Sequence, residues 1–149
     1  MDNNKPYGTI AIQHVGVFVH NLEESAKWYH DIFGFEIVEA RSDERNPGVF
    51  PKAWWLQLGN FYLEMYEVID ARPFDYEDYE FTAGVKHLNF YVENIDKFME
   101  DIYARGDVEV LVDNFYDEEH CGIPGGDRAV YLKDNSGMLV ELSAVYLRS

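Results

Sequence analysis

The order of apolar and polar residues in the first half of the chain predicts four strands around one helix. Residues 9–19 alternate in polarity, as a half-buried strand does. Apolar residues then recur at helical spacing between Asn21, a good helix cap, and Gly34, a good helix end. Three further strands are expected, over residues 35–41, 53–58 and 61–67. The first half therefore predicts the order β-α-β-β-β.

The same order is expected again after residues 68–83, which form a linker. A strand over residues 85–92 precedes a helix between Asn94 and Gly106. Three more strands follow, over residues 108–112, 129–133 and 138–146. A long loop is expected over residues 113–127. The second half thus repeats the order of the first.

Neither half can close a sheet alone, so the two are expected to pack together. We predict one α+β domain over residues 1–149, made of two tandem βαβββ modules at about residues 9–67 and 84–146. The modules should form one curved, cleft-forming mixed sheet of eight strands, with the helices on its outer face.

The repeat also holds at the level of single residues. Residues 14–22 read His-Val-Gly-Val-Phe-Val-His-Asn-Leu and residues 87–95 read His-Leu-Asn-Phe-Tyr-Val-Glu-Asn-Ile, an offset of 73 residues from His to His. Residues 62–65 (Tyr-Leu-Glu-Met) match residues 139–142 (Leu-Val-Glu-Leu) at an offset of 77 from Glu to Glu. Each half therefore supplies one His and one Glu: His14 and Glu64, then His87 and Glu141.

Strand alternation places these four side chains on the face away from the helices. Leu88 and Phe90 should cover the second helix, which turns His87 to the other face, and the same parity applies to His14, Glu64 and Glu141. Two imidazoles and two carboxylates suit a divalent metal: nickel, zinc, cobalt or manganese. Core histidines with satisfied nitrogens are the alternative, and for one isolated His they would be the better interpretation.

The two glutamates lie inside apolar strands, where an unpaired carboxylate is costly. A metal or a cationic side chain must therefore lie beside each of them. The cationic candidates are Lys86, Arg128 and Lys133. A substrate pocket on the same face is expected to be lined by Phe18, Trp55, Tyr62, Tyr66, Asn89 and Tyr91. The glycine-rich loop at residues 122–126 is either a lid over that pocket or an ordinary surface loop.

Composition narrows the class of protein. The formal net charge of −16 disfavours nucleic acid as a partner. No apolar stretch has the length of a membrane span, and residues 1–6 lack an apolar signal region. The single cysteine, Cys121, excludes an internal disulfide and fits a reducing compartment, so a cytoplasmic location is expected.

Several motifs together resemble a known family. They are His14 with Asn21-Leu22, the helix end Phe33-Gly34-Phe35, the strand entry Gly84-Val85-Lys86-His87, and Lys-Asp-Asn-Ser-Gly-Met-Leu-Val-Glu-Leu at residues 133–142. With them, nearly the whole chain resembles the vicinal oxygen chelate superfamily. That superfamily includes glyoxalase I, methylmalonyl-CoA epimerase, extradiol dioxygenases and fosfomycin-resistance proteins, and it reuses one scaffold for several chemistries.

The order His-Glu-His-Glu resembles that of glyoxalase I in particular. Related epimerases commonly have Gln where this chain has Glu64, and the dioxygenases typically use three protein ligands for iron. The resemblance implies a metal-dependent lyase or isomerase that acts through an enediolate, with Glu141 or Glu64 moving the proton. A metal-dependent epimerase and a non-catalytic module that binds a small ligand are the alternatives.

Two positions depart from the glutathione-using glyoxalases. Phe18 stands where that group usually has Arg, and Val68 stands where it usually has Asn. The resemblance therefore implies the metal chemistry more strongly than it implies a glutathione substrate. A small-molecule substrate is expected as the partner, and the site could be built within one chain or across a homodimer.

Overall fold

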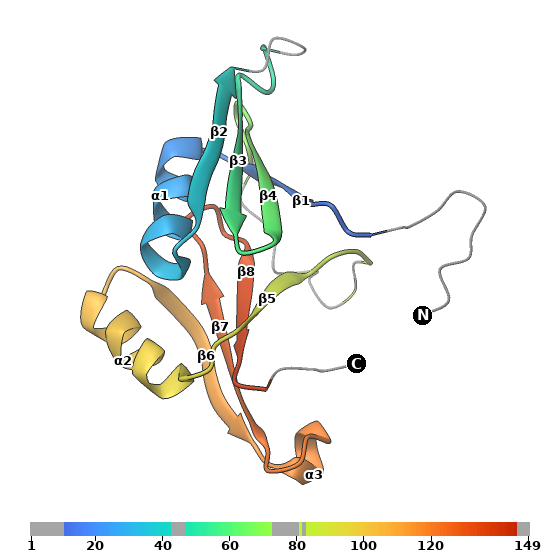
Figure 1. Ribbon diagram of the computed structural model, residues 1–149, viewed down its shortest axis with the longest axis vertical. Helices are drawn as coiled ribbons and strands as arrows, with labels where there is room; N and C mark the ends of the chain where they lie inside the picture. Colours follow the sequence, from blue (N-terminus) through green and yellow to red (C-terminus); the bar gives the residue numbers. More distant parts are fainter. Residues whose placement is uncertain (1–10, 43–46, 73–80, 82, 146–149) are drawn as a thin grey trace, which may run out of the picture. The chain divides into compact units, whose positions relative to one another are not determined.

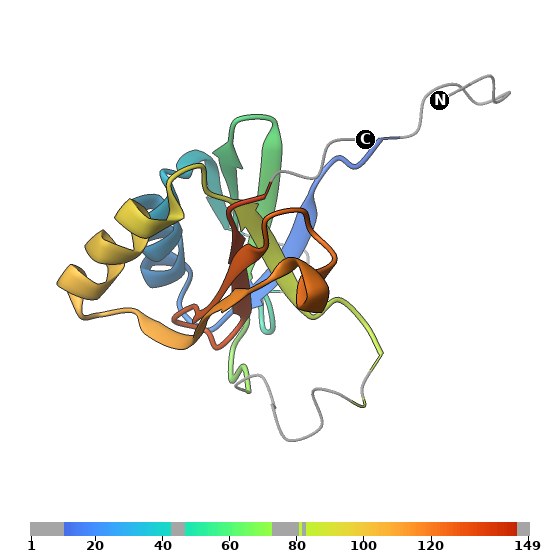
Figure 2. The same cartoon turned by 90° about the horizontal axis from the view of Figure 1, so that it is seen from below.

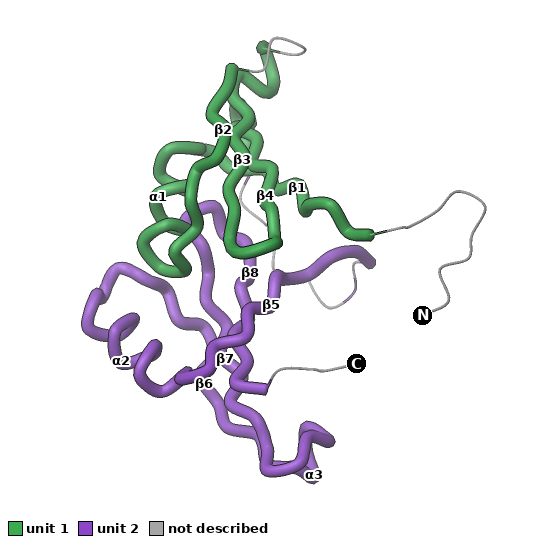
Figure 3. Tube along the Cα trace, viewed as in Figure 1, with its two compact units in different colours: residues 1–71 green, residues 72–149 purple. Residues whose placement is uncertain are grey.

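The computed structural model describes residues 11–42, 47–72, 81 and 83–145 (Figure 1). The chain divides into two compact units, residues 1–71 and residues 72–149 (Figure 3). Among the residues that the structure describes, no helix has the length and apolar character to cross a bilayer.

The first unit is a β-α-β-β-β module. Its elements are β1 (Val15–Val19), α1 (Leu22–Phe33), β2 (Glu36–Ser42), β3 (Lys52–Leu58) and β4 (Phe61–Glu67). They form a four-stranded sheet in the order β1-β4-β3-β2, in which β1 runs parallel to β4 and the other pairs are antiparallel. Helix α1 packs on β3 and β4, and its inner face includes the fully buried Leu22 and Tyr29.

The second unit repeats this topology with one addition. Its elements are β5 (His87–Tyr91), α2 (Ile95–Arg105), β6 (Glu109–Tyr116), α3 (Glu118–Cys121), β7 (Asp127–Lys133) and β8 (Leu139–Ser143). The sheet order is β5-β8-β7-β6, with β5 parallel to β8. The short helix α3 lies in the connection at the end of the β6–β7 pair (Figure 2).

The helix ends follow the sequence. Asn21 Oδ1 accepts a hydrogen bond from the Glu24 N–H at 3.2 Å, and Asn94 Oδ1 accepts one from the Lys97 N–H at 3.1 Å. Gly34 then ends α1 in a left-handed conformation (φ 78°), which glycine adopts without steric cost. The predicted caps and helix ends are confirmed.

The prediction of two tandem βαβββ modules is confirmed, with three differences. Strand pairing gives two four-stranded sheets rather than one sheet of eight strands. Most of the loop expected over residues 113–127 is structured, because β6 continues to Tyr116 in register with β7 and Asp117 then caps α3. The first strand begins at Val15, since residues 11–14 are not in a strand and residues 9–10 lie outside the described residues. Residues 73–80 and 82 of the expected linker also lie outside them.

Candidate metal centre

The first unit brings His14 and Glu64 together. His14 lies directly before β1, and Glu64 lies in β4 opposite Gly16 of β1. The His14 Nε2 atom is 3.3 Å from Glu64 Oε2, and Glu64 is buried. On the other side of β4, Trp55 of β3 stands opposite Glu64. The Trp55 and His14 rings meet edge-on, with their centroids 4.8 Å apart.

Both ring nitrogens of His14 lie beside a side-chain oxygen atom. Its Nδ1 contacts Gln13 Oε1, and its Nε2 is the atom that faces Glu64 Oε2. A metal-binding His commonly has its second ring nitrogen held in this way.

Glu64 has a cationic neighbour that the sequence did not reveal. Arg41, in β2, donates a hydrogen bond from Nη2 to Glu64 Oε1 at 3.2 Å. Its Nη1 atom lies 3.6 Å from Glu39 Oε1. Arg41 was not among the cationic candidates named from the sequence, which were Lys86, Arg128 and Lys133. Arg128 instead pairs with Asp113 and Asp96, and Lys133 pairs with Glu109.

The second unit brings His87 and Glu141 together at the equivalent place. His87 is the first residue of β5, and its Nε2 atom is 2.8 Å from Glu141 Oε2 in β8. Tyr131 of β7 stands opposite Glu141, as Trp55 stands opposite Glu64, and its ring centroid is 5.7 Å from that of His87. Each unit therefore carries the same triplet of His, Glu and an edge-on aromatic ring.

The surroundings of Glu141 differ from those of Glu64. Strand register places Asn114 where the first unit has Arg41: Arg41 is opposite Ala53, and Asn114 is opposite Ala129. Asn114 donates to the Tyr116 hydroxyl at 3.4 Å. Within the part of the chain that the structure describes, His87 is the only ion-pair partner of Glu141.

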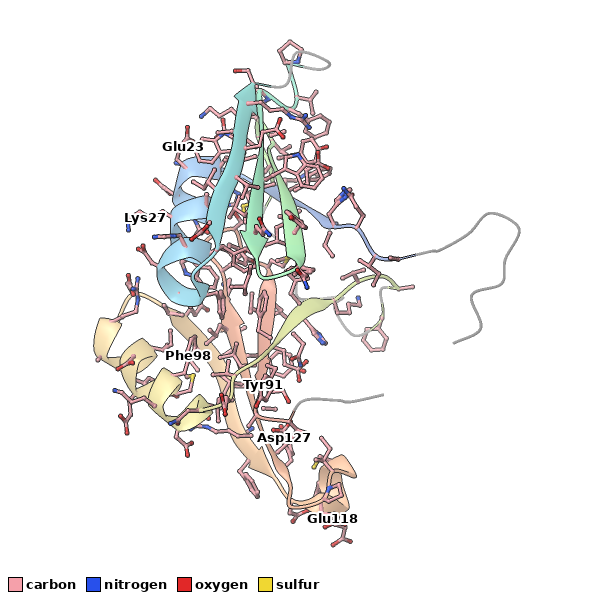
Figure 4. The ribbon with its side chains drawn as sticks, viewed as in Figure 1. Glu23, Lys27, Tyr91, Phe98, Glu118 and Asp127 are labelled. Carbon is pink, nitrogen blue, oxygen red and sulfur yellow. The ribbon has the colours of Figure 1, made fainter. Side chains whose placement is uncertain are left out.

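A hollow adjoins the site in each unit. The hollow of the first unit has a volume of about 420 Å³ and is lined by Gln13, Val38, Glu39, Arg41, Trp55 and Tyr62. That of the second unit has a volume of about 490 Å³ and is lined by Asn89, Tyr91, Ile123, Asp127, Glu141, Ser143 and Val145. Tyr91 and Asp127 are labelled in Figure 4.

The six side chains expected to bind substrate are thus divided among three places. Trp55 and Tyr62 line the first hollow, and Asn89 and Tyr91 line the second. Phe18 and Tyr66 instead pack with Phe50 in an aromatic cluster of the first unit, with ring centroids 5.3 to 5.8 Å apart. Ile123, from the glycine-rich segment after α3, lines the second hollow, and whether that segment acts as a lid stays a prediction.

Comparison with protein-family models gives one match. Residues 11–142 match the model of the Glyoxalase/Bleomycin resistance protein/Dioxygenase superfamily. The chain belongs to this superfamily. The family expected from the sequence is therefore confirmed, and the two βαβββ modules are the repeats of its fold. A comparison with curated proteins finds no match.

Solved structures of this superfamily share the fold. The glyoxalase family protein from Enterococcus faecalis is 22% identical, with a TM-score of 0.70 over 89% of this chain and 96% of that one. FosX from Listeria monocytogenes, a fosfomycin resistance protein, is 21% identical, with a TM-score of 0.66 over 92% and 94%. FosX from Mesorhizobium loti is 15% identical, with a TM-score of 0.63 over 92% and 93%. The Listeria protein, as a mutant, was crystallised with Mn(II) and 1S,2S-dihydroxypropylphosphonic acid.

The two His–Glu pairs fit a divalent cation. Donor atoms about 2.1 Å from the same ion lie roughly 3 Å from each other, and the observed separations are 3.3 and 2.8 Å. Each pair offers two donors, and no group of three or more His, Cys, Asp or Glu side chains that could hold a metal occurs among the described residues.

Proposed function

We propose that the protein is a divalent-metal-dependent lyase or isomerase of the glyoxalase I type. It acts on a small substrate that carries two adjacent oxygen atoms. The observation that supports this proposal best is the repeated pair: each module holds a His Nε2 within 3.3 Å or less of a Glu Oε2 at the equivalent strand position. A single His–Glu pair of this kind is common in proteins. Its occurrence at the equivalent position of both modules favours a shared role for the two pairs.

His14, Glu64, His87 and Glu141 are the proposed ligands, one pair from each module, of one metal ion. Nickel, zinc, cobalt and manganese all suit two imidazoles and two carboxylates. Manganese is the first to test, because the Listeria FosX was crystallised with Mn(II). When bound, the metal would polarise the two substrate oxygens and make the neighbouring C–H bond more acidic.

Glu141 is the proposed base. Its carboxylate takes the proton from the carbon next to the substrate carbonyl, and the electron pair of that bond moves to the carbonyl oxygen, which gives an enediolate. For a 2-hydroxy ketone, Glu141 then returns the proton to the former carbonyl carbon. The hydroxyl proton passes to the former carbonyl oxygen and the hydroxyl carbon becomes the new carbonyl, so that the net change is an isomerisation. Glu64 is less suited to this task, because the Arg41 guanidinium already holds one of its oxygens at 3.2 Å.

The substrate is expected not to carry glutathione. Phe18, at the position where glutathione-using relatives have Arg, packs with Phe50 and Tyr66 rather than presenting a cation. We therefore predict poor or no turnover of the hemithioacetal of methylglyoxal and glutathione. Rapid turnover, followed by the change in ultraviolet absorbance of the thioester, would show that other residues recognise glutathione.

Metal reconstitution followed by isotope exchange tests the proposal. The protein is stripped with a chelator, reloaded with each of the four metals, and analysed for one metal per chain. The loaded protein is then incubated in deuterium oxide with a panel of 2-hydroxy ketones and acyl thioesters. Metal-dependent deuterium incorporation into a 2-hydroxy ketone, detected by mass spectrometry, supports the proposed lyase or isomerase. Exchange into acyl thioesters alone would instead indicate an epimerase.

Two results would contradict the proposal. The first is a wild-type protein that binds none of the four metals. The second is exchange that proceeds equally well in the metal-free protein. Mixing the His14→Ala and His87→Ala variants then shows where the site is built, since recovery of metal binding in the mixture requires pairs from two chains of a homodimer.

A further inference from the structure

The electrostatic environments of the two His–Glu pairs differ by one positive charge. The Glu64 carboxylate accepts a hydrogen bond from the Arg41 guanidinium at 3.2 Å, and its side chain is only 11% exposed. Asn114, a neutral amide, stands at the position of Arg41 in the second module. The first pair therefore has a carboxylate paired with an arginine, whereas no Lys or Arg side chain among the described residues forms an ion pair with Glu141.

The carboxylate of Glu39, which also lies near Arg41, does not cancel the charge difference between the two His–Glu pairs. Glu39 lies 3.6 Å from the other end of the Arg41 guanidinium, but its side chain is 55% exposed, so water screens its charge. The Arg41–Glu64 contact is more buried and is screened less. Glu39 contacts Nη1 of the guanidinium, whereas Glu64 contacts Nη2.

We infer that Arg41 weakens cation binding at the first pair and makes His87–Glu141 the half-site that contributes most of the metal affinity. This inference rests on the proposed metal-dependent function. Arg41 acts in two ways. Its charge opposes that of an incoming divalent cation, and its hydrogen bond occupies Glu64 Oε1, which leaves Oε2 as the atom available to the metal.

Exchanging the two equivalent residues tests the inference directly. Mn(II) affinity is measured by isothermal titration calorimetry on the chelator-treated full chain. Arg41→Asn should bind Mn(II) roughly five- to tenfold more tightly than wild type, because a repelling charge near the ion is removed. Asn114→Arg should bind it more weakly by a similar factor, since it adds a cation beside Glu141. The double exchange should return to nearly the wild-type affinity.

Three further variants separate charge from structure. Arg41→Lys keeps the cation and should stay within about twofold of wild type, whereas Arg41→Gln is a second neutral variant and should match Arg41→Asn. Arg105→Gln removes a cation that pairs with Asp107 on the surface of the second unit, and it should not change the affinity. Thermal melts establish that each variant is folded.

The outcomes distinguish this inference from the proposed function. If wild type binds one Mn(II) per chain and Arg41→Asn and Arg41→Gln bind it more tightly, the result supports the proposed metal site and the role of Arg41. Wild-type binding with unchanged or weaker affinity in both neutral variants overturns the role of Arg41 and leaves the metal site standing. No binding of Mn(II), Zn(II), Ni(II) or Co(II) by wild type overturns both.

Discussion

The two modules present the same donors in different surroundings. Both place a His, a Glu and an aromatic ring at equivalent positions of equivalent strands, with Trp55 in one and Tyr131 in the other. They differ at one position of the outer strand of each sheet. That position holds Arg41 in β2 of the first module and Asn114 in β6 of the second. The repeat therefore supplies a symmetric set of proposed ligands, and the residues that are not repeated give the two carboxylates different neighbours.

A second difference concerns the outer strands. All seven residues of β2 in the first module are exposed, whereas β6 in the second module is longer and leads into α3. The segment that follows α3 contributes Ile123 to a hollow that also contains Glu141. In the second module Glu141, the proposed base, thus lines a hollow. The predictions below test the inequality of the modules, from the largest expected effect to the smallest.

Loss of the imidazole in the second module should have the largest effect. His87→Ala removes the partner of Glu141 at 2.8 Å and should abolish tight divalent-metal binding. His14→Ala leaves the second pair intact and should retain weaker but measurable binding. The readout is metal content by elemental analysis after gel filtration in a metal-free buffer.

A matched control comes from a histidine outside both pairs. His30 contacts the Phe35 carbonyl oxygen through Nδ1 and is not a proposed ligand, so His30→Ala should keep the full metal content. Unchanged metal in His87→Ala would remove this residue from the site. Equal loss in His14→Ala and His87→Ala would mean that the two modules contribute equally.

Replacement of the carboxylates should separate base from ligand. Glu141→Gln should lower turnover by roughly two orders of magnitude or more even when the protein is saturated with metal, because an amide oxygen can coordinate a cation but cannot take a proton near neutral pH. Glu64→Gln should be milder, since Arg41 already restrains that carboxylate. Turnover is followed by deuterium incorporation on the substrate that the exchange panel identifies.

Two outcomes would change the mechanism. Equal loss of turnover in Glu64→Gln and Glu141→Gln would indicate that both carboxylates move protons. Full turnover in metal-loaded Glu141→Gln would leave Glu141 as a ligand alone.

The sequence singled out the proposed ligands because strands keep a period of two and the repeat fixes their register. Glu64 and Glu141 lie at matching positions of β4 and β8, His87 begins β5, and His14 directly precedes β1, so the repeat and strand alternation suggested one face for all four. The aromatic partners Trp55 and Tyr131 repeat in the same way, at an offset of 76 residues, and a search for a third matching strand would have found them.

Arg41 could not be found in this way. It contacts Glu64 through strand pairing across β3, which joins residues 23 positions apart, and the exposed strand β2 carries no burial pattern that would mark its register. A bulge between Ile37 and Glu39 shifts that register further. Helix α3 was missed for another reason: its four residues are polar apart from Cys121, so only the capping residue Asp117 signals it.

Stability should depend more on an ion pair of the second module than on one of the first. Arg128 donates to both oxygens of Asp113 at 2.7 Å and lowers the pKa of that carboxyl below its ordinary value of 3.8, outweighing the opposite effect of burial. Asp113→Asn should lower the free energy of unfolding by about 2 kcal/mol at pH 7. Lys52→Gln removes the pairs of a more exposed Lys52 side chain with Glu23 and Glu67 in the first module, and it should cost less. Glu23 is labelled in Figure 4.

The pH dependence follows from the direction of the shift. Because the folded state lowers the pKa of Asp113, its stabilisation is present above pH 3.8 and is lost as the pH falls through the lower folded-state pKa. Wild type and Asp113→Asn should therefore differ fully at pH 7 and converge below pH 3.8 in urea unfolding curves. A difference that persists unchanged at low pH would show that packing around Asp113, rather than its charge, is responsible.

The smallest effect should come from the helix caps, where the two modules are alike. Asn21 and Asn94 each accept one hydrogen bond from a first-turn N–H, at 3.2 and 3.1 Å. Replacement of either by Ala should cost about 1 kcal/mol, and replacement by Gly only a few tenths. The caps share no partner, so the losses should add in the double Ala variant. Urea denaturation midpoints measure each loss. Unequal losses would show that the asymmetry of the modules extends from the site to the helices, whereas equal losses would confine it to the surroundings of the two carboxylates.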